Sequence, residues 1–210
     1  AIGYESLVLE KTIGGHVAIG FHSLYLTDGA AEGSIAVGSQ AGVNQTTGSA
    51  NVYLGNNAGL NNQTGSNNVL VGQYAGYGGG GSFSNNVYIG YRAGVATTTG
   101  GNNTFVGYQA GNSRTEGNYN IAIGSSALSS LTTLYGNVAI GPNCLLSYTG
   151  TYTTAIGCDA GYALTGVRNT IVGYAACRYN VTGIDNTYVG YEAGAGVAGT
   201  SHSEDTFIGY

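Results

Sequence analysis

Two carboxylates, Asp159 and Glu192, have types and spacing that glycoside hydrolysis can use. They occupy the same position in two copies of a short internal repeat, with one further copy between them. If the copies stack as coils, the two backbones lie ~10 Å apart, near the wide end of the spacing in an inverting acid–base pair. The equivalent residues in other copies are polar and mixed in type. A solvated surface position is therefore the favoured interpretation of both acids.

The other reactive side chains give little support for metal binding or nucleophilic catalysis. The three histidines are scattered along the chain, and Cys144, Cys158 and Cys177 have neither CxxC spacing nor paired histidines. No nucleophile has a histidine and an acid at suitable spacing. The glycines mark chain reversals rather than a phosphate-binding loop between a strand and a helix. The sequence predicts a non-enzymatic protein without metal or cofactor.

Exposed aromatic side chains offer a different function, which is contact with a surface. Tyr91, Tyr108, Tyr174 and Tyr191 each follow a recurring glycine directly. Aromatic faces beside Asn and Thr suit stacking on sugar rings or contact with protein. In the alternative interpretation, the rings stack on one another from copy to copy and stabilise the array. The four tyrosines are the candidate contact residues.

Composition narrows the fold class. Of 210 residues, 39 are Gly and one is Pro, while charged residues make up 7% and the formal net charge is −5. Gly does not recur every third residue, which excludes collagen, and sequence rich in Gly, Asn and Thr is poor helix material. Five Lys and Arg neutralise few phosphates, and no apolar run approaches the ~20 residues of a membrane span. We expect an all-β protein with neither nucleic acid nor membrane insertion.

A short block recurs along the whole chain, as in residues 86–94 (NVYIGYRAG) and 103–111 (NTFVGYQAG). The block is centred on an anchor glycine that recurs from Gly3 to Gly209 with a period of about 17 residues. The anchors predicted to form structural corners include Gly55, Gly72, Gly90, Gly107, Gly124, Gly173 and Gly190. A second Gly, or a Leu, follows four residues later. The two glycines predict a corner at which backbones approach closely.

Two neighbouring columns of the repeat are apolar. The residue before each anchor is always Ile, Val or Leu, which predicts a core column that includes Leu54, Val71, Ile89, Val106, Ile123 and Ile140. The residue before that is apolar or aromatic in every copy. Adjacent strand residues point to opposite faces, so both faces of this strand are apolar. One face can pack inside its own coil, and the other requires a partner chain; we therefore expect an oligomer.

A second corner completes each coil. Asn recurs just before the strand, where its side chain can bond nearby backbone and form a ladder along the axis. We predict a parallel β-roll or β-solenoid of about twelve coils, ~58 Å long at ~4.8 Å per coil. Residues 1–210 form a single repeat array. Because the repeat motif runs to both ends, we expect a fragment of a longer chain or a unit that stacks end to end.

The repeats resemble those of two groups of fibrous proteins. Residues 103–111 look like repeats in the shafts of phage and viral tail fibres. Residues 34–38 (SIAVG) and 137–141 (NVAIG) are similar to head repeats of trimeric autotransporter adhesins, which are trimers of parallel β-rolls that bind host surfaces. The resemblance covers essentially the whole chain. It implies an intertwined or side-by-side homotrimer on a virion or cell surface, outside the cell, with a host protein or glycan as partner.

The leading functional hypothesis is a non-enzymatic fibre segment of a virion tail fibre or surface adhesin that supports host attachment. The alternative is a self-assembling extracellular filament in which copies add end to end. A glycan-degrading enzyme ranks below both. An ice-binding solenoid also ranks low, because its Thr column is interrupted by Val and Ile; the Thr positions are Thr104, Thr154, Thr170, Thr187 and Thr206.

Overall fold

The described part of the chain forms twelve short strands, each three residues long. The computed structural model describes residues 1–9, 14–27, 32–113, 116–130, 133–179, 182–196 and 203–209. The strands are β1 (Val17–Ile19), β2 (Ile35–Val37), β3 (Val52–Leu54), β4 (Val69–Val71), β5 (Val87–Ile89), β6 (Thr104–Val106), β7 (Ile121–Ile123), β8 (Val138–Ile140), β9 (Thr154–Ile156), β10 (Thr170–Val172), β11 (Thr187–Val189) and β12 (Thr206–Ile208). Their β-branched and aromatic residues favour extended backbone. Positive φ on both sides, as at Asn85 and Gly90 around β5, keeps each strand short.

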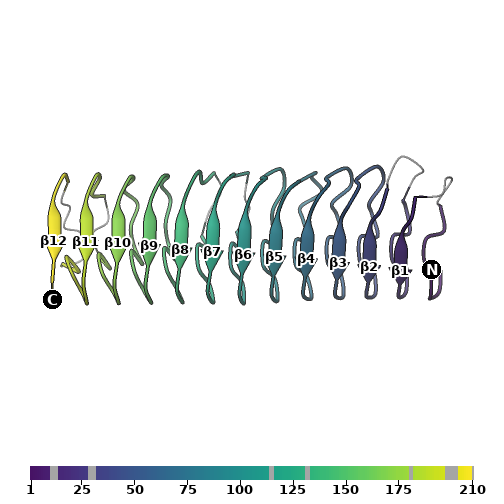
Figure 1. Ribbon diagram of the computed structural model, residues 1–210, viewed down its shortest axis with the longest axis horizontal. Coiled ribbons are helices and arrows are strands. Elements are labelled where there is room, and N and C mark those ends of the chain that lie inside the picture. The colour runs from purple at the N-terminus through teal and green to yellow at the C-terminus, as the bar shows by residue number, and fades with distance from the viewer. Residues whose placement is uncertain are drawn as a thin grey trace.

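All twelve strands form one parallel sheet in chain order. Each strand pairs in register with the next, so that Val17 lies beside Ile35 and Tyr88 beside Phe105. The chain advances by one strand per coil, and the two termini lie at opposite ends of the array (Figure 1). The distance from β1 to β12 is roughly 53 Å at the usual strand spacing. The predicted all-β parallel solenoid is confirmed.

The middle residue of each strand points into the coil and forms one side of its core. Tyr53, Tyr88 and Phe105 are completely buried. The predicted core column is wrong, because alternation along the strand turns both flanking residues outward when the middle one points in. Its members lie on the outer face of the sheet, where Leu54 is 36% exposed and Ile89 is 39% exposed. The residues concerned are Leu54, Val71, Ile89, Val106, Ile123 and Ile140.

A second core column, four residues after the anchor, complements the strand centre in size. Large centres are followed by Gly in the pairs Tyr53–Gly59, Leu70–Gly76, Tyr88–Gly94, Phe105–Gly111 and Tyr188–Gly194, and three Ala centres by Leu in Ala18–Leu24, Ala122–Leu128 and Ala139–Leu145. In Ala36–Gly42 and Ala155–Gly161 both residues are small, and side chains of the adjacent coils lie against the glycine. A Cβ on Gly94 would lie 2.5 Å from the ring of Tyr88. Leu128 shares the left-handed backbone of these glycines, with φ of 51°. The prediction that backbones approach closely here is therefore wrong: a side chain fills the space.

The anchor glycines, in contrast, are required by contact between backbones. The seven predicted corner glycines have φ between 129° and 141°. A Cβ on Gly107 would lie 2.6 Å from the carbonyl oxygen of Gly124 in the next coil. Each anchor stacks on the following one, so the column can hold only Gly.

A buried ladder of Asn side chains joins the coils at the other corner. Asn51, Asn68, Asn86, Asn103, Asn120, Asn137, Asn169 and Asn186 are all at most 1% exposed. Nδ2 of Asn120 donates to Oδ1 of Asn103 at 3.1 Å and to the carbonyl oxygen of Leu134 at 2.9 Å. The same Oδ1 accepts the backbone N–H of Asn120 at 2.9 Å. The predicted ladder is confirmed, and it satisfies polar groups that the corner buries.

Candidate surface-contact site

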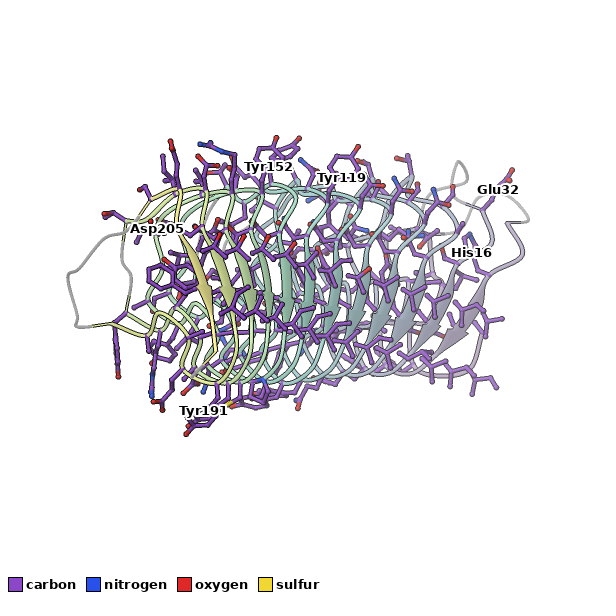
Figure 2. The ribbon with its side chains drawn as sticks, turned by 60° about the vertical axis from the view of Figure 1, so that its left-hand side comes forward. His16, Glu32, Tyr119, Tyr152, Tyr191 and Asp205 are labelled. Carbon is purple, nitrogen blue, oxygen red and sulfur yellow. The ribbon has the colours of Figure 1, made fainter. Side chains whose placement is uncertain are left out.

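The four predicted contact tyrosines form two stacked pairs at the corner that follows the strands. Tyr91 and Tyr108 have ring centroids 5.5 Å apart and an interplanar angle of 14°, and Tyr174 and Tyr191 lie 5.0 Å apart at 17°. All four remain between 39% and 54% exposed. Figure 2 shows Tyr191 projecting from this edge of the rod. The rings therefore stack across coils and still present surface to solvent.

A surface groove of about 370 Å³ lies beside the first pair. Its lining comprises Tyr74, Tyr77, Tyr91, Arg92 and Val95. The ring of Tyr74 is nearly perpendicular to that of Tyr91, at 81° with centroids 6.2 Å apart, and meets that of Tyr77 at 67°. The groove thus has aromatic walls in two orientations and one cationic side chain.

The equivalent region near the second pair contains an arginine that is already partnered. The guanidinium of Arg178 lies 5.6 Å from the centroid of Tyr162 and 5.4 Å from that of Tyr179. It also lies 3.2 Å from a carboxylate oxygen of Asp159. Cation–π and charge contacts together hold this side chain in place.

The two carboxylates considered for glycoside hydrolysis have different surroundings. Oδ1 of Asp159 accepts a hydrogen bond from Asn143 at 3.1 Å, and Oδ2 faces Arg178. Glu192 is exposed and lies two coils further along, with Ala175 in the coil between them. The structure therefore places Asp159 in an ion pair and does not bring Glu192 to it.

The remaining reactive side chains do not converge within the described part of the chain. The three cysteines, all in the described part of the chain, form no disulfide; Cys144 and Cys177 are buried, and burial raises the pKa of Cys144 to about 12. His22 lies 2.7 Å from Glu5 on the surface, and His202 lies outside the described residues. Among the described residues, no group of three or more His, Cys, Asp and Glu is arranged to hold a metal ion.

A second surface is the outer face of the sheet, which carries two columns of residues that flank the strand centres. Both columns consist of Val, Ile, Leu and Thr alone from β1 to β12. Val17 is 43% exposed, Ile35 is 38% and Ile123 is 39%. The face is therefore an uninterrupted uncharged strip along the rod.

Sequence reasoning missed the walls of the groove and two further exposed tyrosines. Tyr119 and Tyr152, 61% and 62% exposed, project from the opposite edge to Tyr191 (Figure 2). Tyr119 precedes Asn120 and Tyr152 precedes Thr153, but the coil between them carries Gly136 at the same position, so the column shows no aromatic pattern. Tyr74 lies two residues after an anchor, in a column that is mixed in type and likewise shows no aromatic pattern.

Comparison with family models, with curated proteins and with solved structures finds no match to this chain. A helix of the length and apolarity needed to cross a membrane is absent from the part of the chain that the structure describes.

Proposed function

We propose that the chain is a non-enzymatic structural segment of an extracellular fibre, as in a virion tail fibre or surface adhesin, and that it supports attachment to a host surface. We further propose that it works as a homotrimer of parallel β-rolls with a repeat of about 17 residues. The observation that carries the proposal is the uncharged outer face of the sheet, which is apolar and half-exposed in the single chain.

The dimensions of this face favour a second copy as its partner. The strip is ~53 Å long and roughly 10 Å wide, so it covers about 500 Å², the size of apolar patches that are often functional contact surfaces. Its side chains repeat at the strand spacing over the full length. Another solenoid of the same pitch matches that periodicity throughout, and a closed cyclic oligomer covers every copy's strip. A rod of this kind also suits a spacer, because its stability accumulates along one dimension.

Oligomeric state tests the proposal directly. Light scattering on the purified chain is expected to give three times the mass of one chain. Ile89→Lys and Ile123→Lys, which place a charge on the outer face, are expected to release monomers. Tyr152→Lys is the matched control, because Tyr152 is 62% exposed and lies off this face. A stable wild-type monomer contradicts the trimer, and unlimited filaments in electron micrographs favour a self-assembling filament instead.

A further inference from the structure

The groove formed by Tyr74, Tyr77, Tyr91, Arg92 and Val95 differs from the rest of the surface in charge. Every Asp and Glu of the sequence lies before residue 33 or after residue 115. The coils from β2 to β6 therefore carry no carboxylate, although acids outnumber Lys and Arg by ten to five in the whole chain. This central section is locally positive in a protein of net charge −5.

Arg92 provides the positive charge of the groove, and no carboxylate pairs with it among the described residues. The other two described arginines are occupied, Arg168 by Asp185 and Arg178 by Asp159. Within the column of Arg92, the nearest acids are Asp159, four coils away, and Glu5, five coils away. Four coils correspond to ~19 Å, which exceeds the Debye length of about 8 Å at physiological salt. The guanidinium therefore remains available for a ligand.

The aromatic walls define what else the ligand must be. Exposed tyrosine faces bind flat apolar surfaces while their hydroxyls bond to polar groups. Tyr91 is fixed by its stack on Tyr108, and Tyr74 by edge contacts with Tyr91 and Tyr77. The volume of about 370 Å³ lies within the ~300–1,000 Å³ range of small-ligand sites. A ring with one face for stacking and an attached anionic group fits these features together.

We propose that this groove binds an acidic sugar residue, with its ring on the tyrosines and its anionic group on Arg92. The planar guanidinium fork matches a carboxylate or sulfate with two parallel hydrogen bonds. The inference rests on the proposed function in attachment and names the ligand class of that contact. It predicts that attachment occurs along the side of the rod, at the section from β4 to β6.

Titration calorimetry with an oligogalacturonate tests the groove, and the methyl ester of the same oligosaccharide is the uncharged control ligand. Binding of the acid form is expected, with loss of affinity of about tenfold or more for the ester and for Arg92→Gln, as for loss of a hydrogen bond to a charged group. Tyr77→Ala is expected to weaken both ligands. Arg178→Gln is the matched protein control, because Arg178 is already paired, and its affinity should equal that of the wild type.

The same titration with a sulfated oligosaccharide shows whether the site prefers a sulfate or a carboxylate. Preference for either of these two anionic groups supports the same site. Equal affinities of both anionic oligosaccharides and the uncharged ester, or of wild type and Arg92→Gln for the preferred anionic oligosaccharide, would overturn the proposal. If light scattering shows a trimer and no oligosaccharide binds, the proposed sugar site is refuted and the proposed trimer is not. If the wild-type chain is a monomer and binds the oligosaccharide, the proposed trimer is refuted and the proposed sugar site is supported. Binding by the Ile89→Lys monomer that disappears in the trimer shows that the groove is a contact between copies.

Discussion

Exchanging side-chain volume between the two core columns provides a sharp test of how the interior is packed. In the coil of β6, Phe105 fills the space above Gly111, and a Cβ on Gly111 would overlap the phenyl ring. In the next two coils the strand centre is small and the residue four after the anchor is large, as in Ala122–Leu128 and Ala139–Leu145. The double variant Phe105→Ala, Gly111→Leu should therefore convert this coil to the pattern of its neighbours.

The magnitudes follow from burial and contact. Phe105→Ala alone removes a fully buried ring and should cost about 4 kcal/mol. Gly111→Leu alone overpacks the coil and should cost about 2 kcal/mol or more. The three nearest atoms to the new Cβ all belong to Phe105, so the first change removes the obstacle to the second. The double variant should lose mainly the stack of Phe105 on Tyr88, worth about 1 kcal/mol, and some apolar burial. It also places Leu at the positive φ of Gly111, as the chain already does at Leu128.

We therefore expect the double variant to be about 2 kcal/mol less stable than the wild type, against about 6 kcal/mol for the sum of the single variants. Urea unfolding followed by circular dichroism measures the cycle, and amide exchange at β6 localises it. The control cycle combines Phe105→Ala with Gly107→Ala in the same coil. A Cβ on Gly107 meets the carbonyl oxygen of Gly124, which no side-chain deletion removes, so this cycle should be additive. A double variant as unstable as the sum of Phe105→Ala and Gly111→Leu would refute the complementarity.

Three further predictions concern polar groups. Asn103→Ala should cost about 1–3 kcal/mol for each partner left unpaired in the ladder, measured by urea unfolding; an unchanged midpoint would show that water replaces the amide. Burial raises the pKa of Tyr53 and raises that of Tyr148 to about 12. Stability from these neutral phenols is thus present below the ordinary tyrosine range and lost as pH rises through the raised values. Ultraviolet titration should show exposed tyrosines ionising first, and a single transition for all would contradict the burial. The hydrogen bonds from Arg168 lower the pKa of Asp185, so its contribution is present above about pH 4 and lost as pH falls below it. Asp185→Asn should reduce the loss of thermal stability in acid, and an unchanged acid profile would exclude this pair as its source.

The repeat architecture could be predicted from the sequence because each coil repeats the same local demands. The anchor column can hold only Gly and is unbroken along the chain. The ladder column is Asn in most coils, with Ser34, Thr153 and Asp205 in its place in others. Parallel pairing in register follows once equal positions stack. These features are imposed by backbone contact and buried hydrogen bonds, which tolerate little substitution.

Sequence reasoning misplaces the core because a uniform apolar column resembles a buried one. The residue before the anchor is uniform because it forms a flat outer face, whereas the true interior varies from Ala at position 122 to Tyr at position 88. In most coils its variation is compensated four residues after the anchor, and at Ala36–Gly42 and Ala155–Gly161 side chains of the adjacent coils fill the space. This relation between the two columns is not apparent when each column is considered alone. The groove at Arg92 could not be predicted for a related reason, since its walls come from three different columns.

The orientation of the hydrogen bonds has a mechanical consequence. Backbone bonds between coils, such as the one from Val87 N–H to the Asn103 carbonyl oxygen, join each residue to one in the next coil and so run along the rod. Tension between the two ends therefore acts on the coil interfaces in series, and the outermost coil separates first. Each coil that separates releases the residues from one strand to the next, 17 between Val87 and Thr104, or roughly 55–60 Å of extended chain. A stretched segment should lengthen in nearly equal steps and absorb work over a long distance, which keeps the peak force on whatever it holds low.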